Sequence, residues 1–268
     1  MTNGTATAAT ARHYFRYWAR TGYAARGTVY LIIGGLASLA AFGRGGATTD
    51  SRGALQTLLE APFGTVLLVL VAVGLVGYAL WRAVQAVQDP DGHGTDLKGL
   101  VIRTGLGISA VLHLLLAAFS LNMIVALGST GDGGSSGFAG WLMGRPYGRV
   151  LVMCCGVAII GAGIAHAIKG WAARFDRYLQ MPPDVRAWAH PVCRFGLIVR
   201  GVALVVIGGL FFAAGYYYDP SSAGGLEAMF DTVRRQPFGT VLFAVIAIGL
   251  CAFGVYGFIE AAYRRVDV

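Results

Sequence analysis

Hydrophobic residues in this chain gather in six long runs that contain no charged side chain. The runs cover residues 27–43, 61–81, 104–131, 150–168, 201–218 and 236–259. A helix that crosses a lipid bilayer needs about 20 mainly apolar residues, and each run reaches or approaches that length. The first span is expected over 22–43, because Arg26 can extend its guanidinium toward the headgroups. The pattern therefore predicts an all-α integral membrane protein with six transmembrane helices.

Three short amphipathic pieces lie between the spans. They read ALQTLLEA at 54–61, FAGWLMG at 138–144 and GLEAMFDTVRRQ at 225–236. Apolar residues at helical spacing beside polar ones predict short amphipathic helices on the membrane surface. A fourth segment, 10–21, carries arginines four residues apart among aromatic residues, which predicts an interfacial amphipathic helix ahead of the first span. The alternative for this segment is a frayed basic tail.

The same helical hairpin occurs three times in the chain. The odd-numbered spans begin with Gly22-x-x-x-Arg26-Gly27, with a degraded Gly105-x-x-x-Ser109-Ala110, and with Gly196-x-x-x-Arg200-Gly201. The even-numbered spans begin with Pro-aromatic-Gly at 62–64, 146–148 and 237–239, and the proline follows the first glycine by 40, 41 and 41 residues. Each proline is expected in the first helical turn, which does not need its N–H. We therefore predict a single membrane domain, 1–268, with tandem helical-hairpin repeats at 22–88, 105–170 and 196–263.

Composition and charge agree with a membrane environment and give an orientation. Hydrophobic residues make up 56% of the chain and charged residues 13%, against the roughly 25% charged residues of soluble domains. Of the Lys and Arg residues, fifteen fall on the side of the two termini and six on the other side. Because excess positive charge stays in the cytoplasm, both termini are predicted to be cytoplasmic. The net charge of +8 therefore needs no nucleic-acid partner, and the expected partner is the lipid bilayer.

The sequence resembles a known bacterial family, the "domain of unknown function 1206" proteins. The resemblance rests on G-Y-A-A-R-G-x-V-Y at 22–30, G-G-L at 224–226, Q-P-F-G at 236–239 and E-A-x-Y-R-R at 260–265. It covers about residues 12–266 and implies paired transmembrane helices repeated three times, in a bacterial cytoplasmic (inner) membrane. The middle repeat departs from the pattern at Ser109, Ala110 and His113.

Polar residues at equivalent repeat positions predict a layer near the cytoplasmic face. Aligned on their prolines, the even spans place Gln85, Lys169 and Glu260 together, and the odd spans place Arg26, Ser109 and Arg200 about one turn deeper. Around a pseudo-threefold axis these six residues would form a ring in which Arg26 or Arg200 pairs with Glu260. Intramembrane ionisable groups often mark routes for solutes, so the six are candidates for a substrate or ion path. Snorkelling to the headgroups is the alternative.

Two histidines, His113 and His166, occur within the spans of the middle repeat. Neutral imidazole can bind haem iron or a metal, or relay protons, so the pair is a weak candidate for a cofactor site. Their predicted depths differ by roughly 10 Å at 1.5 Å per residue, which argues against a shared haem. A polar contact between helices is the alternative.

Complete catalytic motifs are absent from the sequence, which contains no nucleophile elbow, H-E-x-x-H motif, Walker loop or dinucleotide fingerprint. We therefore expect no enzymatic activity, no cofactor and no dedicated metal site. Asp89 and Asp91 lie among turn residues in the sequence PDGHGTD, where a solvated turn is expected.

Three functions remain open on this basis. A small-solute or ion transporter or channel would use a pseudo-threefold central path through the polar layer. A structural or accessory subunit, assembled with a membrane-protein partner or as a homo-oligomer, would use the same residues only for packing. A haem- or metal-binding membrane protein would use His113 and His166.

Overall fold

Six long helices dominate the computed structural model, which describes residues 3–125 and 135–266, with residues 3–15 and 135 as backbone only. The long helices are α1 (Asn3–Ala41), α3 (Gly64–Gln88), α4 (Leu97–Val125), α6 (Gly148–Trp171), α7 (Pro183–Tyr217) and α9 (Gly239–Tyr263). All six are long and apolar enough to cross a membrane. The predicted all-α protein with six transmembrane helices is therefore confirmed.

Short helices separate the two long helices of each repeat, as the amphipathic pieces predict. They are α2 (Ser51–Glu60), α5 (Ser135–Met143) and α8 (Leu226–Arg234). Two 3-10 turns, η1 (Asp176–Tyr178) and η2 (Pro220–Ser222), lie on the remaining connections. Residues 10–21, expected to form an interfacial helix of their own, belong to α1 and continue into the first span without a break.

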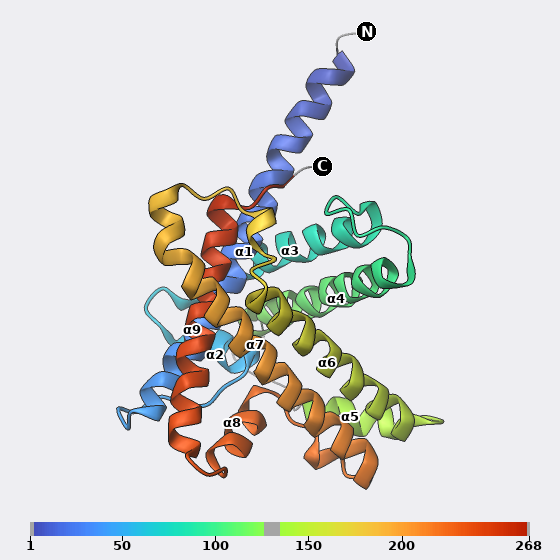
Figure 1. Ribbon diagram of the computed structural model, residues 1–268, viewed down its shortest axis with the longest axis vertical. Helices are drawn as coiled ribbons and strands as arrows, with labels where there is room; N and C mark the ends of the chain where they lie inside the picture. Colours follow the sequence, from blue (N-terminus) through green and yellow to red (C-terminus); the bar gives the residue numbers. More distant parts are fainter. Residues whose placement is uncertain (1–2, 126–134, 267–268) are drawn as a thin grey trace.

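The six long helices form an open ring in chain order (Figure 1). Helix α1 packs on α3, α3 on α4, α6 on α7, α7 on α9, and α9 returns to α1. Between α4 and α6 the described residues make no comparable contact, and the two helices diverge. Only 22% of the most apolar stretch of α4 and 17% of that of α6 is buried, against 44–61% in the other four spans. The middle hairpin is therefore the open side of the ring.

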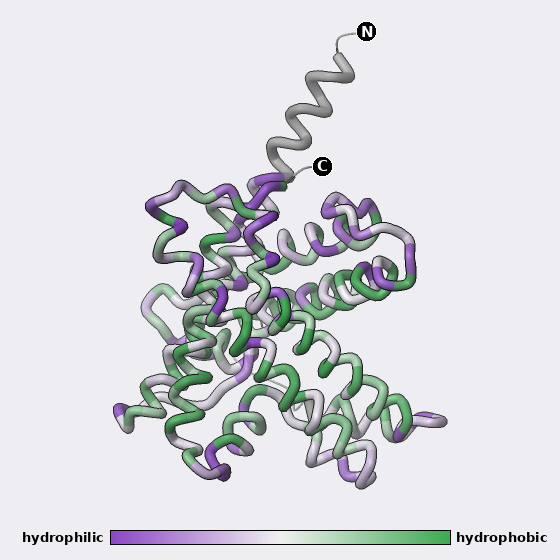
Figure 2. Tube along the Cα trace, in the orientation of Figure 1, coloured by the Kyte–Doolittle hydropathy of each residue, from purple (hydrophilic) through white to green (hydrophobic). Residues whose placement is uncertain are grey.

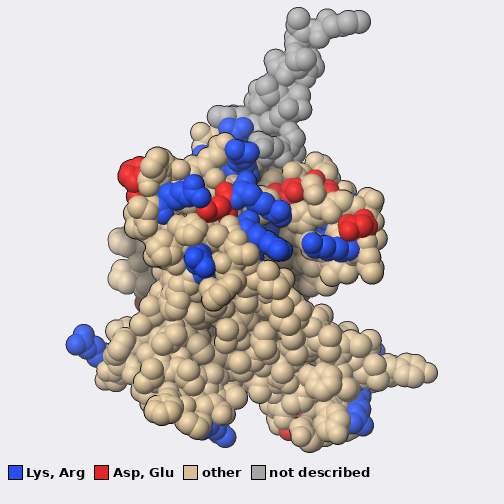
Figure 3. All heavy atoms as spheres, in the orientation of Figure 1, with Lys and Arg blue, Asp and Glu red and all other residues tan. Residues whose placement is uncertain are grey.

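Charge marks the two ends of the bundle. The first and the last described residues of the chain lie on the same side of the bundle, which we call the terminal face (Figure 1). Lysine, arginine and acidic side chains gather there, and a belt of uncharged residues separates them from a smaller group at the opposite face (Figure 3). The hydropathy of the trace follows the same order, with hydrophobic helix segments between polar ends (Figure 2). This distribution suits a bilayer around the middle of the helices.

Three contacts in the ring join the second span of one repeat to the first span of another, and we call these repeat seams. They are α9/α1, α6/α7 and α3/α4. Glycines let the backbones approach closely in the first two seams. A Cβ on Gly34 would lie 2.5 Å from the Cys251 nitrogen, and one on Gly208 would lie 2.7 Å from the Gly156 oxygen. Small residues at such contacts are a common basis of helix packing in membranes.

Each Pro-aromatic-Gly motif forms a tight turn before a span. Phe63, Tyr147 and Phe238 have φ values of 59°, 60° and 60°, and the following glycine starts the helix. The prolines therefore precede the first helical turn, and the prediction that they lie in it is wrong. The glycine N–H bonds back to the carbonyl three residues earlier, at 2.8 Å in all three repeats. The three aromatic side chains are 84–85% exposed, as expected for anchors in a membrane interface.

Candidate functional site

Glu260 on α9 lies at the centre of a buried polar network. The residue is 1% exposed. Its carboxylate accepts hydrogen bonds from Arg26 Nη2 at 2.6 Å, from Arg264 Nη1 at 2.8 Å and from the Tyr256 hydroxyl at 2.8 Å. Arg26 belongs to α1, so this ion pair joins the first span to the last. Two cations and a hydroxyl supply the partners that a buried carboxylate requires.

The network extends from Arg26 along α3. Arg26 Nη1 donates to the Tyr78 hydroxyl at 2.6 Å, and Arg82 Nε donates to the same oxygen at 2.8 Å. Arg82 Nη1 also donates to the Gln85 side-chain oxygen at 3.1 Å. Because Gln85 is 1% exposed, these bonds satisfy polar groups that water does not reach.

Arg264, just beyond the end of α9, closes the network toward the loop after α3. Its Nη2 donates to Asp91 at 3.1 Å, and Asp91 also accepts a hydrogen bond from the Gln85 amide. Burial disfavours the charged form of Arg264, but Tyr23, Glu260 and Asp91 outweigh it and raise the pKa of this guanidinium above its usual value. Arg264 therefore remains a buried cation shared by two carboxylates.

The two aspartates of the loop have different roles. Asp89 accepts hydrogen bonds from the backbone N–H groups of His93 at 2.8 Å and Gly94 at 2.7 Å, and these bonds lower its pKa. A turn is expected for this residue from the sequence. Asp91 also lies in the turn, as expected, but the expectation that its side chain is solvated is wrong, because this side chain is 12% exposed and forms an ion pair with Arg264. The partner that covers it is 173 residues away in the chain.

Lys169 reaches the network from α6 through Tyr256. Its Nζ donates to the Tyr256 hydroxyl at 3.0 Å, and that hydroxyl in turn donates to Glu260. The ammonium also lies 5.5 Å from the centroid of the Tyr256 ring, within cation–π range. The network therefore unites four of the six residues predicted for the polar layer, namely Arg26, Gln85, Lys169 and Glu260.

Arg200 and Ser109 lie outside the network. Arg200 stacks over the rings of Tyr30 and Phe253, with centroid distances of 5.0 and 5.9 Å, and has no hydrogen-bond or ion-pair partner among the described residues. Ser109 contacts His113 on its own helix, at 3.4 Å from the hydroxyl to Nδ1. The structure therefore pairs Arg26 with Glu260 and leaves Arg200 without a carboxylate.

The three seams differ in charge at equivalent positions of the repeats. The positions of Arg26 and Glu260 in seam α9/α1 correspond to Arg200 and Lys169 in seam α6/α7, and to Ser109 and Gln85 in seam α3/α4. One seam thus carries opposite charges, one carries like charges, and one is neutral. Like charges in a membrane interior repel unless another group compensates them. Lys169 turns toward Tyr256, whereas Arg200 keeps an uncompensated charge.

A central cavity of about 350 Å³ lies inside the open ring, next to Arg200. All three repeats contribute to its wall, through α1, α2, α3, α4, α7 and α8. The ionisable side chains in its wall are those of Arg26, Asp50, Arg52, His113 and Arg200, and the remaining wall is mainly aliphatic. Binding sites for small molecules have this character, with apolar walls and a few polar groups, and begin at about 300 Å³.

The two histidines have similar hydrogen bonds but different neighbours. His113 Nδ1 bonds the Ser109 carbonyl at 2.7 Å, and His166 Nδ1 bonds the Ala162 carbonyl at 2.9 Å. In each ring Nε2 is therefore the nitrogen left for another partner. His113 packs against Tyr78 and lines the central cavity. Among the described residues no group of three or more His, Cys, Asp or Glu side chains could hold a metal ion. Haem or metal binding by these histidines stays a prediction.

Sequence reasoning missed five members of the network. They are Tyr78, Arg82, Asp91, Tyr256 and Arg264. The sequence spacing of four of them could have revealed their role, because residues four apart lie on the same face of a helix. Tyr256, Glu260 and Arg264 have this spacing, and so do Tyr78 and Arg82. Polar side chains at that spacing near the end of an apolar run indicate a buried polar stripe.

Fold and site together define the class: the protein is a multi-pass membrane protein built from three helical-hairpin repeats around a polar core. Comparison with known proteins supplies the family. The model of the "Domain of Unknown Function (DUF1206)" family matches residues 21–89, 104–173 and 195–264, and the chain belongs to that family. The chain is similar to "Uncharacterized protein YxxB" of Bacillus subtilis (strain 168), with 30% identity over 258 residues that cover 94% of this chain and 92% of that protein. No solved structure matches the chain.

Proposed function

We propose that this protein is a membrane transporter whose central cavity binds an organic anion with an apolar body. The proposal rests above all on Arg200, a cation at the start of the uncharged run of α7 that lines the cavity without a carboxylate partner among the described residues. An uncompensated charge inside a membrane is expensive and is usually retained for function. An anionic group beside Arg200 would compensate it, and the aliphatic walls would cover the rest of the solute.

In this proposal the polar network is the barrier on one side of the cavity. Arg26 belongs to both, because its side chain lines the cavity while it bonds Glu260 and Tyr78. The network joins α1, α3, α6 and α9 next to the terminal face. Transport requires the barrier to open and reclose, and separation of α1 from α9 at the Arg26–Glu260 pair is the step that would open it.

The proposed setting is the cytoplasmic membrane of a bacterium, with the terminal face in the cytoplasm. The uneven distribution of Lys and Arg supports this orientation. The arrangement would place the polar network on the cytoplasmic side and Asp50 near the outer end of the cavity. Because no complete catalytic motif is present, the proposal involves transport and no enzymatic reaction.

Uptake into liposomes tests the proposal. The probe is naphthalene-2-sulfonate, which keeps its charge and so does not cross lipid as a neutral acid. A quaternary ammonium compound of similar size tests charge selectivity. Protein-containing vesicles are expected to take up the sulfonate and exclude the ammonium, and Arg200→Gln should slow uptake about tenfold or more, as expected for a charge-assisted bond of about 1.5–3 kcal/mol. Arg174→Gln, at an exposed position after α6, is the control. Equal uptake in vesicles without protein would refute the proposal.

A second candidate function is that of an accessory subunit, and the divergence of α4 and α6 favours it. Large apolar side chains of these two helices are exposed: Leu112 and Leu115 of α4, which also line the central cavity, are 58% and 60% exposed, and Val157 of α6 is 56% exposed. A helix of a membrane-protein partner, or of another copy of this chain, would fill the opening. Purification in a mild detergent should then recover a stoichiometric partner or a homo-oligomer, whereas a transporter that acts alone should elute as a single chain.

A further inference from the structure

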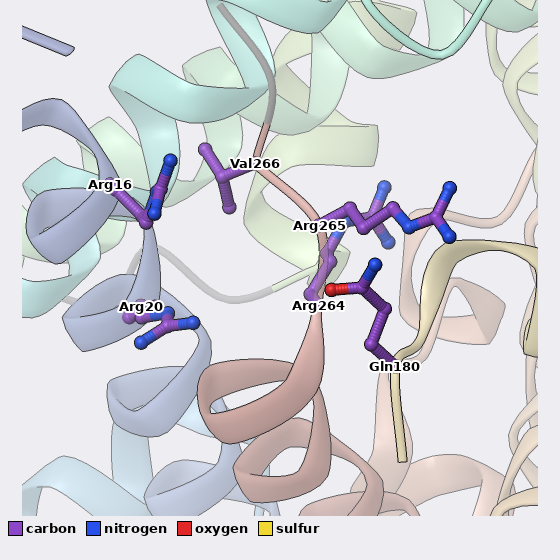
Figure 4. A pocket seen from close by; sticks show the side chains of 6 residues that line it. All are labelled: Arg16, Arg20, Gln180, Arg264, Arg265 and Val266. Carbon is purple, nitrogen blue, oxygen red and sulfur yellow. The ribbon is translucent and has the colours of Figure 1, made fainter. Parts of the chain in front are cut away.

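Four arginines surround a pocket on the terminal face that is separate from the central cavity. Arg16 and Arg20 come from α1, and Arg264 and Arg265 follow α9 (Figure 4). Gln180 and Val266 complete the wall of the pocket, whose volume is about 330 Å³. The segments that supply these residues lie far apart in sequence, so folding gathers the positive charges in one place.

Among the described residues, the positive charges of the pocket are only partly compensated by carboxylates. Arg264 is held by Glu260 and Asp91. With its amide oxygen turned toward Arg265, Gln180 accepts from Arg265 Nε at 2.8 Å, but an amide carries no negative charge. Among the described residues that line the pocket there is no carboxylate.

Two guanidinium nitrogens at this pocket are buried without a hydrogen-bond partner. They are Nε of Arg20 and Nε of Arg264, and Arg264 as a residue is only 4% exposed. A buried donor without a partner is costly, and more so when it is charged. Arg26 Nε in the polar network is in the same state, so unpaired Nε atoms accompany close packing of guanidinium groups in this protein. The observation that calls for a bound acceptor is therefore the pocket itself, where the guanidinium groups of Arg16, Arg20 and Arg265 meet without a carboxylate among the described lining residues.

We propose that this pocket binds a phosphate group. Planar guanidinium groups match the oxygens of phosphate and bind them in pairs of parallel hydrogen bonds. A phosphate with two negative charges would balance the local excess, and its oxygens would accept from Arg16, Arg20 and Arg265. The arginines of the pocket precede the uncharged run of α1 or follow the end of α9, so both a lipid headgroup and a free phosphate compound can supply the ligand.

The phosphate site would communicate with the polar network through one side chain. Arg264 lines the pocket and donates to Glu260, the acceptor of the Arg26 ion pair. A phosphate that attracts the Arg264 guanidinium would weaken its bond to Glu260. Binding at the surface is thereby linked to the buried contact between the first and last spans.

Binding measurements on the full chain test the site. One arm measures calorimetric binding of pyrophosphate in neutral detergent. The other compares thermal stability in phosphatidylcholine nanodiscs with and without phosphatidic acid. Arg16→Gln and Arg265→Gln change residues that form no ion pair among the described residues, so both variants should fold. Arg174→Gln is the control, because it removes an exposed arginine outside the pocket.

Saturable binding of pyrophosphate, or a higher thermal stability with phosphatidic acid, is expected in at least one arm. Each pocket variant should lower the affinity for pyrophosphate about fivefold or reduce the gain in thermal stability, and the control should change neither. Response to pyrophosphate alone would assign the site to a soluble phosphate compound, and response to phosphatidic acid alone would assign it to a lipid headgroup. No binding in either arm, or an equal loss in Arg174→Gln, would overturn the proposal.

Discussion

The seams α9/α1 and α6/α7 are built alike but carry opposite electrostatics. Both bring glycines of two spans into backbone contact, and both place an arginine of the odd span near the polar end of the even span. In α9/α1 the facing residue is Glu260, and an ion pair forms at 2.6 Å. In α6/α7 the equivalent residue is Lys169, and Arg200 is left facing the cavity. The same repeated frame therefore forms either a buried ion pair or an arginine without a carboxylate partner among the described residues, depending on the charge of one facing residue.

The largest effect is expected from Glu260→Gln in the paired seam. The change leaves Arg26 and Arg264 without their shared carboxylate, and the loss of one partner of a buried pair costs about 3–5 kcal/mol. Titration with a denaturing detergent in mixed micelles measures the free energy of unfolding of the natural chain and of the variant. A loss of less than about 1 kcal/mol would show that the pair does not hold α1 to α9.

Packing in the two seams should respond alike to larger side chains. Gly34→Leu in α1 and Gly208→Leu in α7 force a side chain against the backbone of the facing helix, at an expected cost of about 1–3 kcal/mol or more. Their neighbours Gly35 and Gly209 have no atom within 4 Å of a Cβ and serve as matched controls. If substitutions at the seam and control positions lowered the free energy of unfolding equally, close backbone packing in the seams would be contradicted.

Arg200→Gln should have a much smaller effect on stability than Glu260→Gln. Arg200 forms no ion pair among the described residues, so its loss removes only stacking on Tyr30 and Phe253, which is about 0.5–2 kcal/mol. The unfolding free energy is expected to fall by that amount or to rise, because an uncompensated charge also disappears. A loss as large as that of Glu260→Gln would mean that Arg200 has a structural role in its seam.

The smallest effect is expected at Asp89, in the loop that joins the two spans of the neutral seam α3/α4, and it should appear as a change in the acid dependence of stability. Backbone hydrogen bonds lower the pKa of Asp89, so its folded-state pKa lies below its unfolded-state value. The contribution of Asp89 to stability is therefore present above the unfolded pKa and disappears as the pH falls through the folded pKa. Thermal unfolding of Asp89→Asn at a series of pH values below about 5 should be less pH-dependent than that of the natural chain. An unchanged acid dependence would exclude this contribution.

The amino-acid sequence predicts the fold better than the site, for physical reasons. Spans and surface helices follow from local hydrophobic patterns, and repeats follow from residues such as Gly22 and Pro62 at fixed spacing. The bond between Arg26 and Glu260 is anticipated only as one of two options, because a choice between Arg26 and Arg200 depends on which helices become neighbours. Asp91 could not be found from its loop, since its partner is distant in the chain.

Local sequence patterns also could not predict the opening between α4 and α6. The repeats predict three equivalent hairpins, but the two long helices of the middle hairpin do not pack on each other in the structure. Its spans keep large aliphatic residues on faces that remain exposed, such as Leu112 and Val157. Apolar periodicity in a membrane protein does not distinguish a face that contacts lipid from one that contacts another helix, because both are apolar.

The most direct test of the account is equilibrium binding of naphthalene-2-sulfonate to the detergent-solubilised protein. The natural chain and Arg174→Gln should bind the sulfonate saturably with equal affinity, whereas Arg200→Gln, still folded, should bind it about tenfold more weakly or not at all. The same affinity in Arg200→Gln and the natural chain, or no saturable binding in any of them, would contradict the assignment of Arg200 as the anion-binding group.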